Sequence, residues 1–474
     1  MKRVRKAGIA CALWLAAVVF CVGPAWAAAR ARYGGTLRIA CSGLQPDADP
    51  LLADAPSDAA LSRLTLQPLC RWQAGERIQQ VLIAETTQVN ARTWRITLVP
   101  NARLSGAGPL TARDVAQSWA RLGNHATLSP YRAFLSPLRG EGRQLEGAIL
   151  STSVLELSTT FAWPDLPKSL CHPSLAIAAQ PSRSGLGFAG VGPFVPRPRG
   201  DFLDQNSSFP LGRPYLDRLK VVFVTGRRAL RLLSLGQVDL VLGEAEQKSA
   251  IARGAALYAT YLAFKPERTG GEFRKDFERA VDRTQLTQFF APAASVPMFN
   301  LLPPALMSQA PLPTPAAPAT RGVPTPLTLF YDQALPEQRS VAERIQVKLH
   351  DLGYRIALKA IPRSELRSRW ASGQFDLMLN AVLMPPVAGP ALALAIELAG
   401  RHDLLASELP AIGAEQDASR REAKARERAV ALGPELAVIP LYAQSLVLSS
   451  SPRWYLPFDA QGLPQLDDAF AMHE

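Results

Sequence analysis

The chain has 474 residues, a formal net charge of +12 and 48% hydrophobic residues. This length supports two or three domains with sizeable cores. The basic residues are spread along the sequence, and their densest cluster, at 420–428, has acidic residues interleaved, as a solvated helix face does. Because no segment combines aromatic and basic residues as single-strand binders do, we expect no nucleic-acid partner.

The first 27 residues have the pattern of a secretory signal peptide. Four basic residues within 2–6 precede an apolar stretch at 9–22, and Ala25-Trp26-Ala27 places small residues around a cleavage site. The alternative is an uncleaved membrane anchor. Because the apolar stretch is shorter than the roughly 20 residues that span a bilayer, we expect cleavage and secretion.

Three cysteines follow this segment: Cys41, Cys70 and Cys171. An oxidising compartment permits one disulfide among them and leaves an odd thiol. The spacing of the three residues does not choose the pair.

The first predicted elements are a strand at 36–40, a helix at 59–69 and a hairpin within 77–98. The segment 93–122 has the clearest pattern. Trp94, Ile96 and Leu98 alternate with polar residues, as in a half-buried strand. Thr111 then lies three residues before Asp114, which is typical of a capped helix start.

Strands and helices alternate through the rest of the chain. The next predicted elements are a strand at 219–224, a helix at 227–235, a strand at 261–264 and a helix at 272–290. After a proline-rich surface loop at 309–326 come a strand at 327–330, an amphipathic helix at 337–352, a strand at 354–361, a helix at 415–432 and a strand at 438–442. This alternation predicts a mixed α/β fold with parallel units.

Motifs for cofactor, metal or catalytic chemistry are weak. Residues 185–190 fit GxGxxG, but Pro193, Pro196 and Pro198 follow where a dinucleotide site needs a helix, so we expect a flexible loop. The five histidines are isolated, and neither a zinc motif nor a nucleophile elbow is present. We therefore expect no cofactor, no metal and no catalytic residues. A secreted hydrolase remains open, because catalytic carboxylates meet in space and not in sequence.

Several short segments resemble the family 5 extracytoplasmic solute-binding proteins, the peptide- and nickel-type receptors of ABC importers. Each is weak alone, but they occur in the same order from residue 34 to about residue 468. The matching segments are GGTLRIA at 34–40, the strand, loop and helix at 93–122, GVGPF at 190–194, GRPYLD at 212–217, GQVDL at 236–240, YLAF at 261–264 and VIPLY at 438–442.

The resemblance implies a two-lobed periplasmic binding protein-like α/β fold with mixed sheets and a hinge between the lobes. On this basis residues 28–258 form lobe I, with 440–474 returning to it, and residues 259–439 form lobe II. It also implies a non-enzymatic, monomeric periplasmic protein that captures a small molecule and delivers it to an ABC membrane permease. A sensor or accessory protein of the same fold is the second hypothesis.

The family's peptide-binding members pair the ligand's α-amine with an acidic residue in the loop after the strand that corresponds to 375–379. Here the loop 380–390 has Val382 at the usual tryptophan and Pro385 near the place of the acid, and no carboxylate lies between Asp376 and Glu397. Because a buried ammonium without a countercharge costs several kcal/mol, we expect an apolar or weakly polar ligand, or a peptide held only by its backbone.

The resemblance places the candidate ligand-binding residues in the loop, on the crossing strands and before Pro303-Pro304. Lys265 replaces the family's usual asparagine near the hinge. For the aromatic candidates, the alternative is core packing. The candidates are Phe264, Phe299, Asn380, Met384 and Tyr442.

Overall fold

The computed structural model describes residues 33–75, 77–124, 127–138, 145–181, 187–197, 201–224, 226–243, 252–307 and 326–472. The expected signal peptide at 1–27 lies outside the described residues, as do the first two residues of the GxGxxG motif and residues 309–325 of the proline-rich loop. No helix in the described ranges is long and apolar enough to cross a membrane.

One mixed sheet of 11 strands runs through the whole molecule. Along the sheet the strands follow the order β12 (Phe194–Pro196), β13 (Phe202–Gln205), β14 (Arg218–Phe223), β1 (Thr36–Cys41), β15 (Leu240–Leu242), β21 (Val438–Ser450), β16 (Ala252–Phe264), β20 (Leu377–Leu383), β18 (Leu327–Asp332) and β19 (Ile356–Ile361), with β17 (Ser295–Pro297) paired to β21.

The sheet contains two parallel units separated by an antiparallel middle, and the edge formed by β12, β13 and β14 is also antiparallel. At one end β1 lies between β14 and β15, parallel to both, and at the other β18 lies parallel to β19 and β20. In the middle, β16 runs antiparallel to both β21 and β20, with Tyr261 opposite Asn380 and Thr260 opposite Tyr442. The mixed α/β class with parallel units is therefore confirmed.

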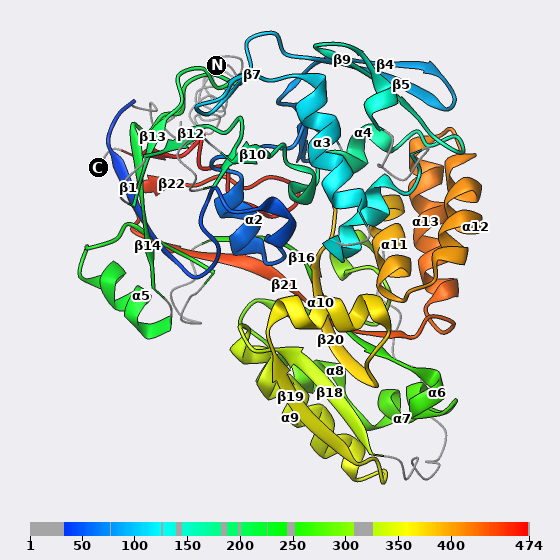
Figure 1. The fold of residues 1–474 in the computed structure, drawn as a ribbon. Coiled ribbons are helices and arrows are strands. Elements are labelled where there is room, and N and C mark those ends of the chain that lie inside the picture. Colours follow the sequence, from blue (N-terminus) through cyan, green and yellow to red (C-terminus); the bar gives the residue numbers. More distant parts are fainter. Residues whose placement is uncertain are drawn as a thin grey trace, which may run out of the picture.

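Figure 1 shows two lobes of unequal size, with β16, β20 and β21 running between them. The larger lobe contains β1, α2 (Pro56–Ser62), α3 (Ala112–Gly123), α4 (Leu166–Ser169) and α5 (Gly226–Ser234). The smaller lobe contains β18, β19, α6 (Pro266–Thr269), α7 (Phe273–Ala280), α9 (Pro336–His350) and α10 (Arg363–Ser372). Helix α8 (Arg283–Phe289) packs against β17.

A second sheet in the larger lobe carries the segment with the clearest sequence pattern. Its strands lie in the order β4 (Ile83–Asn90), β5 (Thr93–Leu98), β9 (Val154–Ser158) and β8 (Ile149–Ser151). Helix α3 then begins with a full capping box, in which the Thr111 and Asp114 side chains each accept a hydrogen bond from the other residue's backbone N–H. Two-stranded sheets complete the lobe: β2 (Cys70–Gln73) with β3 (Arg77–Gln80), β6 (Arg103–Leu104) with β7 (Gly108–Pro109), β10 (Ala179–Pro181) with β11 (Phe188–Ala189), and β22 (Trp454–Tyr455) with β23 (Phe470–Ala471).

Helices α11 (Ala388–Leu398), α12 (His402–Gly413) and α13 (Ala418–Leu432) pack in the larger lobe. Helix α11 contacts the 3₁₀ helix η3 (Pro130–Leu135), where Arg132 pairs with Glu397, and Arg421 of α13 forms a bidentate pair with Asp165. The family resemblance assigns 259–439 to lobe II, and that division of the chain stays a prediction; the contacts show that these three helices pack against the larger lobe. The pattern of a helix shows which face is buried, but not which lobe covers that face.

Cys70 and Cys171 form a disulfide, and Cys41 is a buried free thiol. The sequence permits one disulfide but leaves open whether it forms and between which cysteines, and the structure answers both questions.

Candidate functional site

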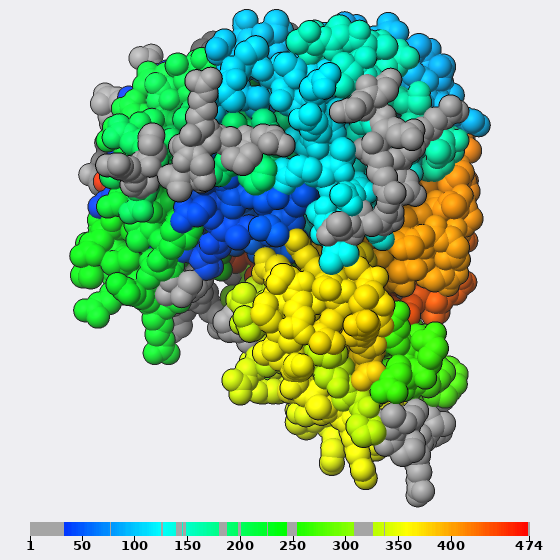
Figure 2. Space-filling model, in the orientation of Figure 1, coloured from blue at the N-terminus to red at the C-terminus, as the bar shows by residue number. Residues whose placement is uncertain are grey.

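A cavity of about 50 Å³ lies where the two lobes meet. By the usual measure this is room for a few water molecules. The larger lobe contributes Asp54, Pro130 and Leu398, the connecting strands contribute Tyr258, Asn380, Ala381 and Val382, and the smaller lobe contributes Asp332, Leu335, Gln338, Arg363, Leu366, Arg367 and Trp370. Figure 2 shows the yellow surface of the smaller lobe meeting the blue and cyan surface of the larger lobe at this junction.

One face of α10 forms the wall on the side of the smaller lobe. Arg363, Leu366, Arg367 and Trp370 have the i, i+3, i+4, i+7 spacing that places side chains on one helix face. All four line the cavity. The same helix therefore brings two guanidinium groups and one indole ring to the junction.

The two arginines connect the lobes through ion pairs. Arg367 donates from Nε to Asp54 Oδ2 at 3.1 Å and from Nη2 to the Leu51 carbonyl at 2.8 Å. Arg363 donates to Asp58 Oδ2 at 3.2 Å across the junction and to Asp332 Oδ2 at 2.6 Å within its own lobe. These contacts join the two lobes directly in this structure.

The indole and one carboxyl group add to this junction. Trp370 donates from Nε1 to the Leu398 carbonyl at the end of α11, at 3.0 Å. Burial raises the pKa of Asp58, and the nearby Arg363 guanidinium opposes part of that rise. Burial also raises the pKa of Tyr258 well above its ordinary value, which keeps its hydroxyl protonated.

Two polar atoms of the cavity walls have no hydrogen-bond partner. They are Asp54 Oδ1 and Asn380 Nδ2, and the two residues are only 8% and 9% exposed. Buried polar groups are almost always paired, so an unpaired acceptor and an unpaired donor in one cavity call for an explanation.

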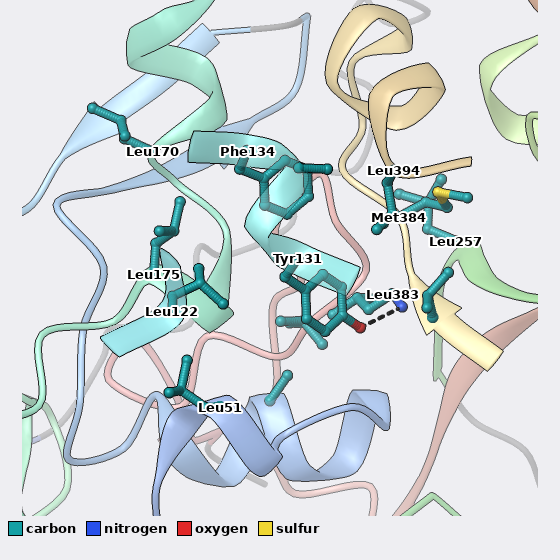
Figure 3. Close-up of a cluster of buried hydrophobic side chains, with 14 of the residues drawn as sticks. Leu51, Leu122, Tyr131, Phe134, Leu170, Leu175, Leu257, Leu383, Met384 and Leu394 are labelled. Carbon is teal, nitrogen blue, oxygen red and sulfur yellow. Dashed lines mark hydrogen bonds between the residues drawn. The ribbon is translucent and has the colours of Figure 1, made fainter. Parts of the chain in front are cut away.

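The loop after β20, which carries no carboxylate, is fixed to the larger lobe through its backbone. The Leu383 N–H donates to the Tyr131 hydroxyl at 2.9 Å, as Figure 3 shows. The His172 Nε2 donates to the Leu383 carbonyl at 3.0 Å. The buried Glu422 carboxylate accepts a hydrogen bond from the Ala388 N–H, at the start of α11. These residues determine where the loop lies.

Of the five residues predicted for the site, Asn380 lines the cavity and the other four lie elsewhere. Phe264 packs on Phe273 with ring centroids 5.2 Å apart, and Tyr442 is buried in the same core. Met384 is buried in the main core, and the half-buried Phe299 ring lies 5.4 Å from the Arg283 guanidinium. Packing accounts for these four positions, and ligand contact by any of them stays a prediction.

Sequence reasoning missed the charged residues of the cavity. The only local signal for them is the helical spacing of Arg363, Leu366, Arg367 and Trp370. Asp54 and Asp332 come from distant segments, and nothing in their local sequence indicates that they meet these arginines. No group of three or more potential metal ligands occurs in the part of the chain that the structure describes.

Comparison with known proteins matches most of this chain to one family model. The model for the bacterial extracellular solute-binding proteins, family 5 middle, matches residues 77–392. A curated relative, the uncharacterized protein YhjP of Bacillus subtilis, is 32% identical over 140 residues. That match spans 29% of this chain and 23% of the relative, so about a quarter of the relative's length is covered.

Solved structures agree with the fold. OppA of Burkholderia pseudomallei has a TM-score of 0.73 at 16% identity, over 92% of this chain and 99% of that chain. The Escherichia coli murein tripeptide binding protein MppA has a TM-score of 0.73 at 15% identity, over 94% and 100%. NikA of Staphylococcus aureus, in complex with Ni(L-His)2, has a TM-score of 0.69 at 16% identity, over 90% and 97%.

Proposed function

This chain belongs to the bacterial extracellular solute-binding proteins, family 5, and we propose that it captures a small molecule in the cavity between its lobes and delivers it to the membrane permease of an ABC importer. The proposal includes a periplasmic location after removal of residues 1–27, a monomeric state and no chemical change to the ligand.

The observation that carries the proposal is that both lobes and the strands between them line one cavity. A ligand in such a place touches both lobes only when they are closed. It therefore stabilises the closed state by the difference between its affinities for the closed and open states. Closure is the signal that a permease needs in order to distinguish loaded protein from empty protein.

The pairing of the charged groups favours binding over catalysis. Asp54 and Asp332 each accept hydrogen bonds from an arginine of α10. Both carboxylates are therefore engaged in ion pairs. A secreted hydrolase would need a carboxyl group free to exchange protons.

Native mass spectrometry of the protein purified from its own periplasm tests this function. We expect one small molecule per chain, released on unfolding, chemically unchanged, and able to raise the melting temperature when added back. Binding should also change the fluorescence of Trp370, and Trp370→Phe should remove most of that change while keeping the thermal shift.

Two results would contradict the proposal. Recovery of a chemically altered molecule would indicate an enzyme. If no molecule co-purified and no fraction of a periplasmic extract raised the melting temperature, solute capture itself would be excluded.

A further inference from the structure

The charged side chains that line the cavity are two carboxylates, Asp54 and Asp332, and two guanidinium groups, Arg363 and Arg367. Their formal charges cancel when all four are ionised, and Asp58, which pairs with Arg363, does not line the cavity. A ligand's charge is therefore selected by the side-chain atoms that these ion pairs leave without a partner, and a carboxylate oxygen that no guanidinium occupies favours a cation.

The unpaired atoms show where such a cation would bind. Asp54 uses Oδ2 for Arg367, while its Oδ1 is buried and has no donor. Asn380 Nδ2, on β20, is buried and has no acceptor. Each residue is more than nine-tenths buried, and both line the cavity. A ligand that satisfies both must offer a hydrogen-bond donor and an acceptor, and an ammonium group is the strongest donor to a carboxylate.

On the premise that the proposed function holds, we propose that the cleft binds a small amine that also carries a neutral oxygen acceptor. The ligand's ammonium group donates to Asp54 Oδ1 and its oxygen accepts from Asn380 Nδ2. The rings of Tyr258 and Trp370, which also line the cavity, offer π-faces to the cation. This assignment differs from the apolar or weakly polar ligand that the loop 380–390 suggests, because the carboxylates come from other segments.

The size of the cavity limits the ligand. With the lobes placed as in this structure, a volume of about 50 Å³ admits only a few heavy atoms. A longer molecule requires α10 to move away from Asp54. The geometry therefore selects a compact amine, such as an amino alcohol, over an extended chain.

Isothermal titration calorimetry with four matched probes tests the ligand class. Ethanolamine has both groups, ethylamine lacks the oxygen, ethylene glycol lacks the charge and glycolate is an anion. We expect ethanolamine to bind at least tenfold more tightly than ethylene glycol or glycolate, and several-fold more tightly than ethylamine. Equal binding of ethylene glycol and ethanolamine, or tighter binding of glycolate, would overturn the assignment.

Variants locate the two contacts. Asp54→Asn should weaken ethanolamine binding at least tenfold. Asp58→Asn is the matched control, because Asp58 also pairs with an arginine of α10 but does not line the cavity. It should change the affinity less than threefold. Asn380→Leu should reduce the affinity for ethanolamine to the affinity for ethylamine, and it should leave the affinity for ethylamine unchanged. Equal losses in Asp54→Asn and Asp58→Asn would exclude the direct contact.

The same measurements separate this inference from the proposed function. If a neutral or anionic molecule co-purifies and raises the melting temperature while ethanolamine gives no heat, the amine assignment fails and solute capture stands. If neither the probes nor any extracted molecule binds, both fail.

Discussion

His172 shows how a single residue fixes the junction of the lobes. Its ring is fully enclosed between aromatic side chains, with Tyr131 and Phe134 at centroid distances of 4.6 and 4.7 Å. Its Nδ1 accepts a hydrogen bond from the Ser174 N–H, while Nε2 donates to Leu383. Burial lowers the pKa of His172 to about 3. The ring is therefore neutral at ordinary pH, and it acts as a fixed link.

This low pKa predicts that stability falls as the pH decreases. In the unfolded chain a histidine takes up a proton near pH 6.5, whereas in the folded protein His172 resists protonation down to about pH 3. The unfolded state thus binds more protons in this window, and His172 alone lowers the free energy of unfolding by up to about 1.4 kcal/mol per pH unit as the pH falls from 6.5 towards 3. Above pH 6.5 His172 is neutral in both states, so it no longer lowers the free energy of unfolding.

Urea unfolding between pH 7 and pH 4 checks this. His172→Gln should be less stable at pH 7 but should lose less stability on acidification than the unmodified protein. His350→Gln, a change at an exposed histidine, serves as the control. If the free energy of unfolding fell equally with pH in the His172 variant and in the unmodified protein, His172 would not be the source of the pH dependence.

The Cys70–Cys171 disulfide joins two residues 101 positions apart in the chain. Cross-links across long loops restrict the unfolded chain strongly, and loss of a native disulfide commonly costs about 2–5 kcal/mol. We expect the double variant Cys70→Ala/Cys171→Ala to lose stability in this range in urea unfolding. Cys41→Ala is the comparison, because it changes a cysteine outside the disulfide. Equal stability of the double variant and the unmodified protein would show that packing alone holds this region.

At the scale of the element, the arginines of α10 differ in whether their ion pairs reach the other lobe or stay within the helix. Arg363 and Arg367 reach across the junction, whereas Arg369 donates to Glu365 on the same helix at 2.8 Å. Exposed pairs within a helix contribute only a few tenths of a kcal/mol. A pair that is largely buried differs, because removal of one partner leaves the other charge without compensation.

We therefore predict that Arg367→Gln shifts the unliganded protein towards an open arrangement. Closure would then bury Asp54 without its countercharge, and opening exposes that carboxylate to water. Small-angle X-ray scattering should show a larger radius of gyration than for the unmodified protein, whereas Arg369→Gln should leave it unchanged. An Arg367→Gln variant as compact as the Arg369→Gln control would show that the ion pair does not hold the lobes together.

At the scale of the whole molecule, the fold is more predictable from the sequence than the site. The capped start of α3 and the buried face of α9, with Val341, Ile345 and Leu349, follow from local spacing and are confirmed. Such signals lie within one turn or one strand. The two lobes follow only from the family resemblance, and the single sheet that connects them is a finding of the structure.

The parts that could not be predicted depend on contacts between distant segments. Arg367 and Asp54 are 313 positions apart, and Arg421 and Asp165 are 256 apart. The second pair fixes α13 in the larger lobe, and the first closes the cavity. The loop 380–390 carries no carboxylate. This does not settle the ligand's charge, because Asp54 and Asp332 reach the same cavity from other segments of the chain.

The continuous sheet predicts that the lobes unfold together. Strand β16 pairs with β21 from Ala252 near the larger lobe to Ala263 in the smaller one, and with β20 from Tyr258 to Phe264. The core of the smaller lobe includes Ile439, Leu441 and Tyr442 of β21, whose later residues belong to the main core. If one lobe unfolded, the shared strands would lose hydrogen bonds and packing contacts, and this loss would destabilise the other lobe.

Hydrogen exchange at increasing urea concentration measures this coupling. Peptides from β18 and α9 should lose protection at the same urea midpoint as peptides from β1 and α3, as expected for one cooperative unit. Because a ligand bound in the cavity touches both lobes, it should raise both midpoints equally. A lower midpoint confined to β18 and α9 would mean that the smaller lobe unfolds on its own. The three connecting strands would then act as a flexible hinge with little energetic coupling.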